Sequence, residues 1–459
     1  MSVDSPLRTP DRAWGGVPVL GHAWRLLRDP LGFVESLREY GEVVTIRLGT
    51  KTVYAVCAPE LVGELLTKRA RSTVVGGALW ETLEGLIGKG VATSNGSLHV
   101  RQRRMIQPAF RPEHLAGYAE IMAGEVGAMV ERWQPGRVID VYREVFDLAV
   151  RAVSRSMLNT PSADRRTGEF CASLLTVFSG MYRRMVLPAG PLYRLPVPAN
   201  RRFGRALATM HRIVDEIVEE RRAGGTGGAD LLSVLLAARD GAGEPLSDQE
   251  IHDHVVSVLV AGSETVASTL VWIFPLLARH PHEEARLHRE VDAVIGTRPV
   301  CAGELPRLPH TRNVITETMR LHTGAWIFTR RTTAGIDLGG FRIPEGADVL
   351  YSTYAMQRDP RSFDRPSAFD PDRWLPERAA RVPRFAMMPF GAGNRICPGN
   401  DFTMIEATLM LATVASRWRL VPVPSTDTAA RIGITLRPRR LHMRTEARRA
   451  TGAAYTAPV

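Results

Sequence analysis

The feature that most constrains the fold is one long apolar-periodic segment, residues 247–280. Ser247-Asp248-Gln249-Glu250 has the pattern of a helix-capping box, with Ser followed by Glu three residues later. Apolar residues then recur at spacings of three and four as far as Ile273, and no proline occurs before Pro275. A helix of ~30 residues is ~45 Å long, which is enough to cross a whole domain. We therefore expect one central helix, kinked near its end by Pro275.

The remaining pattern is mostly helical, with a smaller β portion. Val43–Ile46 and Val53–Val56 favour strands on either side of a short Gly-containing turn, which predicts a β-hairpin. Strand and loop patterns return after Thr333. Although 459 residues would often form two or three domains, no linker divides the pattern. The prediction is a mainly α fold with a minor β portion: a flexible segment 1–15, a single large domain 16–445, and a disordered tail 446–459.

Composition and charge narrow the class of protein. The chain is 44% hydrophobic and 23% charged, as in soluble globular proteins. The formal charge is +11, but the arginines are spread along the chain without an aromatic-interleaved stripe, so we do not expect nucleic-acid binding. No run of 18 or more apolar residues occurs, so no transmembrane anchor is expected. The four cysteines have neither zinc-site nor disulfide spacing, which favours a reducing, cytoplasmic location.

The sharpest chemical signal is one cysteine in a glycine-rich segment, Phe390-Gly391-Ala392-Gly393-Asn394-Arg395-Ile396-Cys397-Pro398-Gly399. Glycines allow a tight turn and the close approach of a flat ligand. The N-terminus of the following helix can offer N–H groups to an anionic sulfur, and Arg395 can pair with a carboxylate of the ligand. One alternative is a buried free cysteine in a turn. A dinucleotide-binding loop is excluded, because Ile396 replaces the third glycine and no βαβ unit surrounds it.

This segment resembles the cysteine-ligand loop of the cytochrome P-450 family, F-G-x-G-x-R-x-C-x-G, at every fixed position. Other segments resemble the same family, from about Gly16 to Leu441. They are Glu317-Thr318-Met319-Arg320 with Arg373 downstream, Ala261-Gly262-Ser263-Glu264-Thr265 on the long helix, His99-Val100-Arg101-Gln102-Arg103, and Arg330. Taken alone, Gly262 could be a packing glycine, an E-x-x-R pair occurs on many solvated helices, and an Arg-rich helical turn is usually solvated.

The resemblance implies a haem b cofactor with Cys397 as the thiolate ligand of the iron. Phe390, Gly391 and Gly393 would shape the ligand loop. His99, Arg103, Arg395 and either Arg330 or Arg331 would hold the haem propionates; the family more often has Trp where His99 stands. Glu264 and Thr265 would be catalytic, in dioxygen activation and proton delivery. The Glu317–Arg320–Arg373 set would be structural.

The resemblance also implies a monooxygenase that uses dioxygen and electrons from NAD(P)H. The haem fold takes up nearly the whole chain, so separate ferredoxin and ferredoxin reductase are expected, docking on a basic face that includes Arg101, Arg104 and Arg111. We expect a monomer. The rivals are a haem-thiolate isomerase, against which Glu264-Thr265 argues, and a non-catalytic haem-binding protein.

The substrate is predicted from three further stretches, Leu79–Leu86, Met181–Pro188 and Arg431–Pro438. They resemble bacterial family members of secondary metabolism that oxidise sesquiterpenes such as epi-isozizaene, by allylic hydroxylation continuing to the ketone. An apolar pocket is expected from Val256, Leu259, Val260, Trp326, Ile327 and Phe328. Ordinary core is the alternative for these residues, and a fatty acid, steroid or polyketide is the alternative substrate.

Overall fold

The computed structural model describes residues 8–186, 190–224, 228, 230–296 and 298–448. Its helices are α1 (Ala23–Arg28), α2 (Pro30–Ser36), α3 (Pro59–Leu66), α4 (Ala78–Ile87), α5 (Gly96–Ile106), α6 (Pro112–Glu131), α7 (Val141–Val153), α8 (Pro161–Val186), α9 (Gly190–Arg194), α10 (Pro198–Ala223), α11 (Leu231–Ala237), α12 (Asp248–Leu270), α13 (Ile273–Arg279), α14 (Pro281–Val294), α15 (Pro309–Leu321), α16 (Thr353–Met356), α17 (Pro376–Ala379) and α18 (Asn400–Arg417). The mainly helical prediction is confirmed.

The strands form one larger sheet and three small ones. They are β1 (Asp11–Arg12), β2 (Val43–Leu48), β3 (Lys51–Val56), β4 (Thr73–Val74), β5 (Val138–Asp140), β6 (Phe328–Thr332), β7 (Ile336–Leu338), β8 (Phe341–Ile343), β9 (Asp348–Tyr351), β10 (Trp418–Pro422), β11 (Asp427–Ile432), β12 (Leu436–Arg440) and β13 (His442–Ala447). The larger sheet has the order β1-β2-β3-β9-β6-β4; the small sheets are β10-β13-β5, β11-β12 and β7-β8. The predicted hairpin is β2-β3, paired antiparallel from Val43↔Val56 to Leu48↔Lys51.

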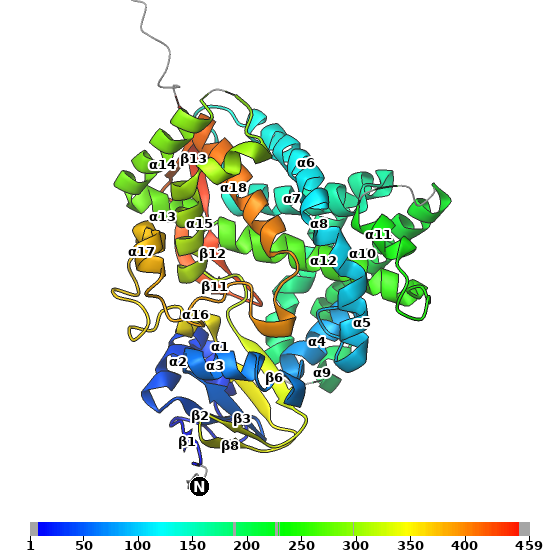
Figure 1. Cartoon of the computed structure of the whole chain (residues 1–459), viewed down its shortest axis with the longest axis vertical. Helices are drawn as coiled ribbons and strands as arrows, with labels where there is room; N and C mark the ends of the chain where they lie inside the picture. Colours follow the sequence, from blue (N-terminus) through cyan, green and yellow to red (C-terminus); the bar gives the residue numbers. More distant parts are fainter. Residues whose placement is uncertain (1–7, 187–189, 225–227, 229, 297, 449–459) are drawn as a thin grey trace, which may run out of the picture.

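The predicted central helix is α12. Its capping box is present: the Glu250 N–H donates to the Ser247 hydroxyl, and the Ser247 N–H donates to the Glu250 carboxylate. The helix packs against α4, α7, α10, α15 and α18, and Figure 1 shows it near the middle of the molecule. A turn separates it from α13 one helical turn before Pro275, where the missing N–H of proline leaves the Val271 carbonyl without its helical partner.

The segment Asp248–Arg279 is long and apolar enough to cross a membrane, but 78% of its most apolar window is buried inside the protein. This burial is typical of the core helix of a globular fold, because most of the apolar side chains pack inside the protein and do not face its surroundings. A large cluster of buried apolar residues surrounds it.

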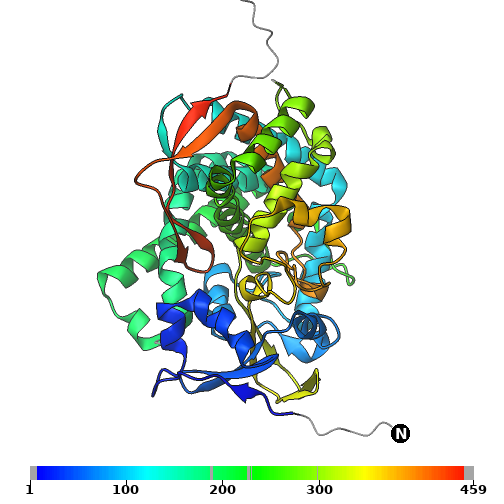
Figure 2. The ribbon, with the colours of Figure 1, turned by 90° about the vertical axis from the view of Figure 1, so that its left-hand side faces the viewer.

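Both ends of the predicted domain need a correction. Asp11–Arg12, placed in the flexible segment, pairs in parallel with β2. Glu446 and Ala447, placed in the tail, belong to β13, and the next residue, Arg448, forms an ion pair with Asp292. Strand pairing and an ion pair hold these residues, and neither contact could be expected from local polarity. Residues 1–7 and 449–459 lie outside the described residues. Figure 2 shows β1 and β13 towards opposite ends of the molecule.

Candidate functional site

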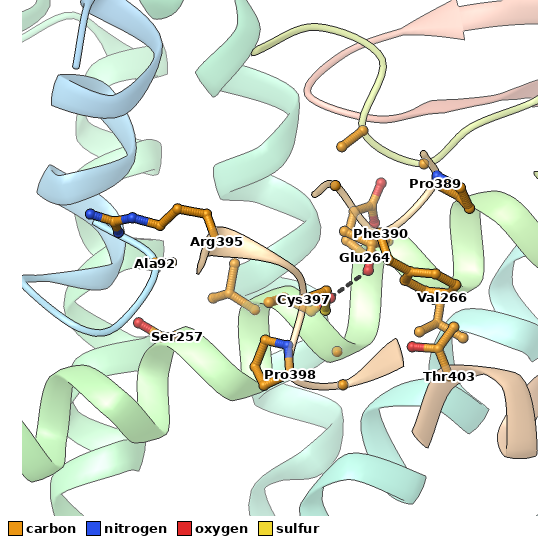
Figure 3. Close-up of a pocket in the computed structure, with 18 of the residues that line it drawn as sticks. Ala92, Ser257, Glu264, Val266, Pro389, Phe390, Arg395, Cys397, Pro398 and Thr403 are labelled. Atoms are coloured by element: carbon orange, nitrogen blue, oxygen red, sulfur yellow. Dashed lines mark hydrogen bonds between the residues drawn. The ribbon is translucent and has the colours of Figure 1, made fainter. Parts of the chain in front are cut away.

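A cavity of about 390 Å³ lies between α12 and the loop before α18. Its walls come from α4, α5, α8, α12, β6, that loop and the turn between β11 and β12. Figure 3 shows Arg395, Cys397 and Pro398 on the loop and Ser257 and Glu264 on α12. The central helix and the cysteine loop therefore face the same space, although Glu264 and Cys397 are 133 positions apart in the sequence.

The cysteine loop is closed by its own backbone. The Cys397 N–H donates to the Phe390 carbonyl at 2.9 Å. Gly391 and Gly393 have φ values of +74° and +69°, a region that favours glycine. A Cβ on Gly393 would also lie 2.1 Å from the Leu66 carbonyl oxygen of α3. Both predicted loop glycines are thus required by the backbone, and the closed loop presents the Cys397 side chain to the cavity.

Cys397 lies three positions before the first residue of α18, and the N-cap residue of that helix is Gly399. Burial among protein atoms raises the pKa of the Cys397 thiol, whereas the Gly399 N–H and the Arg103 guanidinium lower it. The side chain is nonetheless accessible, because its free surface faces the cavity. Burial raises the pKa of Cys57 and of Cys171 to about 12, and neither lines this cavity. A sulfur open to a cavity beside a helix N-terminus is suited to bind a metal as the thiolate.

Four basic side chains gather on one side of the cavity: His99, Arg103, Arg330 and Arg395. Burial and the three arginines lower the pKa of His99 to about 4, and burial and Arg330 lower the pKa of Arg395 to about 10. None of the ion pairs between described residues includes any of the four; Arg103 donates to the Ile396 carbonyl and Arg395 to Asn95. A ligand that carries carboxylates would supply the missing charge.

Arg331, the alternative to Arg330, has acidic partners of its own. Its guanidinium contacts Asp348 at 2.8 Å and Glu81 at 3.2 Å. Arg330 is 7% exposed, donates to the Thr329 carbonyl beside it and lies over the ring of Trp80. The alternation of side chains along β6 sends the two arginines to opposite faces, and Arg330 is the one that lines the cavity.

Glu264 is buried on α12 with both carboxylate oxygens occupied. The Tyr142 hydroxyl donates to Oε2 at 2.6 Å, and the Thr435 hydroxyl donates to Oε1 at 2.7 Å. Burial raises the pKa of Glu264, whereas these two donors and the nearby Arg437 lower it. We did not predict Tyr142 or Thr435. Thr435 lies within one of the resembling stretches, but no local pattern marks Tyr142, which is on α7.

Thr265 lines the cavity one residue further along α12. Its hydroxyl donates to the Ala261 carbonyl at 2.5 Å, and α12 is continuous through this segment. A Cβ on Gly262 would lie 2.7 Å from a methyl group of Val153, so Gly262 lets α7 approach α12. For Gly262 the packing role is therefore sufficient.

The Glu317–Arg320–Arg373 set is assembled in the core. Arg320 contacts Glu317 at 2.8 Å, both side chains are fully buried, and Arg373 approaches the same carboxylate at 3.4 Å. Arg320 also donates to the carbonyls of Gln357, Pro366 and Ala368. The network ties α15 to the segment before the cysteine loop, which fits the structural role that we predicted.

Two predictions are wrong in part. Arg101 cannot belong to a free basic face, because Asp240 and Glu250 contact its guanidinium at 2.7 and 2.5 Å. Of the six predicted pocket residues, the three that line the cavity are Val260, Ile327 and Phe328, whereas Val256, Leu259 and Trp326 are buried in the core. An apolar run predicts burial but not which neighbouring element each side chain faces.

Comparisons with known proteins agree with this geometry. The family model described as Cytochrome P450 matches residues 13–441. Cyclooctatin synthase of Streptomyces melanosporofaciens is 44% identical over 95% of both chains. Pentalenene oxygenase of Streptomyces avermitilis is 43% identical over 95% of this chain and 96% of its own. The solved structure of retinoic acid bound cyanobacterial CYP120A1 superposes with a TM-score of 0.87 at 25% identity, over 96% of this chain and 100% of its own.

The chain belongs to the cytochrome P450 family, and it is a haem-thiolate monooxygenase. The cavity fits this cofactor: a thiol beside a helix N-terminus faces apolar walls, and at one edge lie basic side chains that form no ion pair with any described residue. Reducing equivalents come from NAD(P)H, as in the family generally.

Proposed function

We propose that this protein hydroxylates a C–H bond of a cyclic terpene, with Cys397 as the iron ligand. The observation that carries the proposal is the apolar character of the cavity. Its α12 side is apolar apart from four side chains, which are Ser257, Glu264, Thr265 and Thr269. The names of the relatives agree: one is an oxygenase of pentalenene, and another, 42% identical, is cyclooctat-9-en-7-ol 5-monooxygenase of Streptomyces melanosporofaciens.

All three stretches that predicted the substrate contribute to the cavity wall. Leu79, Trp80 and Leu83 come from the first stretch, Met185 from the second, and Ile434 from the third. Residues 187 and 188 of the second stretch lie outside the described residues. Burial of apolar ligand surface against such walls contributes roughly 25 cal/mol per Å². These five side chains offer no charged group to a fatty-acid carboxylate. We infer a sesquiterpene of the epi-isozizaene type, oxidised at an allylic position and onwards to the ketone.

The roles of the chain follow from its geometry. Haem bound through a thiolate supplies the activation of dioxygen and the transfer of one oxygen atom to carbon. Cys397 would hold the iron; His99, Arg103, Arg330 and Arg395 would hold the propionates; Phe390, Gly391 and Gly393 would keep the loop closed. The Thr265 hydroxyl would position a proton donor in the cavity, and Glu264 would resupply that proton. The apolar walls would exclude bulk water.

The setting of the reaction is also proposed: a cytoplasmic monomer that takes electrons from a ferredoxin and its reductase. Arg104 and Arg111 are exposed on α5 and directly before α6. Phe110, the neighbour of Arg111, lies against Gly399 beside the cysteine. A negatively charged ferredoxin could therefore dock close to the Cys397 loop.

The test is a substrate-induced spin-state titration of the purified holoenzyme with epi-isozizaene, pentalenene and lauric acid, followed by product analysis with ferredoxin, ferredoxin reductase and NADPH. We expect both terpenes to shift the spin state at micromolar concentration and a hydroxylated terpene to form. A shift with lauric acid alone would overturn the terpene proposal. An unchanged reduced carbon-monoxide spectrum in Cys397→Ser would overturn the ligand assignment.

A further inference from the structure

A second cavity, of about 210 Å³, adjoins the first on the far side of Glu264. The two cavities share Phe178, Glu264, Ile434 and Thr435 in their walls. The second cavity is polar where the first is apolar: its other lining residues include Tyr142, Ser179, Arg183, Arg431 and Arg437. Glu264 is thus the ionisable side chain that the described walls of both cavities have in common.

The Glu264 carboxyl is fixed by two hydroxyls that are themselves fixed. Tyr142 is 6% exposed, its ring lies under the Arg437 guanidinium at 4.1 Å, and it stacks on Phe146. Thr435 is 5% exposed, and its backbone pairs with Ala325. A hydroxyl both donates and accepts, so each can donate to the carboxylate and accept from the protonated acid without moving its oxygen. The set can therefore hold Glu264 in either protonation state.

Burial and the neighbouring positive charges shift the pKa of Glu264 in opposite directions. Burial favours the protonated acid, whereas Arg437 on β12 and Arg431 on β11 favour the carboxylate. From α8, Arg183 and Tyr182 face the second cavity. No other acidic side chain lines either cavity among the described residues. The two arginines therefore offset part of the cost that burial adds to ionising the Glu264 carboxyl.

We propose that Tyr142 and Thr435 are positioning residues that hold Glu264 in the wall between the two cavities, where it takes a proton from water in the second cavity and delivers it to the first. This inference rests on the proposed role of Glu264 as a proton donor. The reaction consumes two protons per turnover, and for each of them one proton enters Glu264 from solvent as one leaves towards Thr265, so Glu264 is regenerated. The second cavity serves as a proton entrance, separate from the apolar space for substrate.

The first test removes each hydroxyl. Tyr142→Phe and Thr435→Val each delete one donor to the carboxylate. The matched controls are Tyr182→Phe, a residue that lines the same cavity but whose hydroxyl donates to the Leu26 carbonyl, and Thr408→Val, a buried threonine on α18. Infrared difference titration of the ferric holoenzyme without substrate follows the Glu264 carboxyl, assigned through Glu264→Gln. We expect the Glu264 pKa to rise by about one to two units in the two test variants and to stay unchanged in both controls.

The second test blocks the entrance. Ser179→Phe fills the second cavity, and Ala172→Phe adds the same ring on the exposed face of α8. We expect Ser179→Phe to lower product formed per NADPH by about tenfold and to raise the solvent deuterium isotope effect. Its terpene-induced spin shift should remain, since the first cavity is untouched.

The outcomes separate the inference from the proposed function. Unshifted infrared titration in Tyr142→Phe and Thr435→Val, or full coupling in Ser179→Phe, would overturn the positioning and entrance roles while leaving the terpene reaction intact. Full coupling in Glu264→Gln would instead overturn the proposed proton donor. Loss of the spin shift with every terpene would overturn the proposed substrate alone.

Discussion

Arg330 and Arg331 are adjacent on β6, and the structure predicts opposite consequences for their loss. Arg330 is 7% exposed and has no acidic partner among the described residues, whereas Arg331 contacts Asp348 and Glu81. In the haem-free protein, the positive charge of Arg330 helps to lower the pKa of Arg395. Arg330→Gln should therefore stabilise the apoprotein, by on the order of 1 kcal/mol, because burial rather than Arg330 is the larger cause of that lowered pKa.

With haem bound, the sign of the Arg330→Gln effect reverses. A hydrogen bond to a charged partner contributes roughly 1.5–3 kcal/mol, so losing the contact to a propionate should weaken haem binding about 10- to 150-fold. Arg331→Gln removes two ion pairs in which the arginine side chain is 33% exposed, and each costs about 0–1 kcal/mol of stability. Its haem affinity should stay as in the unmodified protein.

Two measurements check this pair of variants. Urea unfolding of the apoproteins gives the free energy of unfolding, and haem transfer to excess apomyoglobin gives the rate of haem loss. Equal haem loss from both variants would refute the assignment of Arg330 to a propionate. A lower free energy of unfolding for the Arg330→Gln apoprotein than for the unmodified apoprotein would refute the claim that the Arg330 charge is uncompensated.

Three further outcomes are expected. Gly393→Ala, at φ +69° and against a backbone carbonyl of α3, should cost more than about 2 kcal/mol and abolish the reduced carbon-monoxide spectrum, whereas Gly124→Ala, with open space around it, should keep both. Burial raises the pKa of Glu406 to about 8, so folding takes up a proton between pH 4.5 and 8, and the stability of the protein falls as the pH rises across that window. Glu406→Gln should therefore raise the free energy of unfolding in urea by up to roughly 4 kcal/mol at pH 8, and should not raise it below pH 4.5. Arg111→Glu should slow the reduction by ferredoxin, measured by stopped flow, most strongly at low salt, and a slowing that does not depend on salt would contradict docking at Arg111. Arg101→Glu should instead lower the melting temperature, because Arg101 already forms ion pairs with Asp240 and Glu250.

Much of the site could be predicted because its residues occur as local patterns. The glycines around Cys397 are required by local backbone geometry, and the helix that begins at Ser247 carries its own capping signal. Glu317 and Arg320 are three residues apart on one helix, so their contact is local as well. Local geometry is visible in a sequence because neighbouring residues determine it.

The errors and omissions concern contacts between distant elements. Tyr142 reaches Glu264 across 122 positions, and Asp240 reaches Arg101 across 139. Neither contact has a signal in the local pattern. An arginine with an acidic partner and one without look the same in a sequence, and only packing distinguishes them.

The sequence alone determined the central helix and the cysteine loop, because spacing and backbone conformation specify each of them locally, whereas the family resemblance indicated the basic residues. The tertiary structure decided which arginine faces the cavity, which apolar residues line it, and that Glu264 stands between an apolar and a polar cavity. These depend on how α7, α12 and the β11–β12 hairpin pack together. Packing brings together side chains that no local interaction connects, and the apolar surface that drives it carries little directional information.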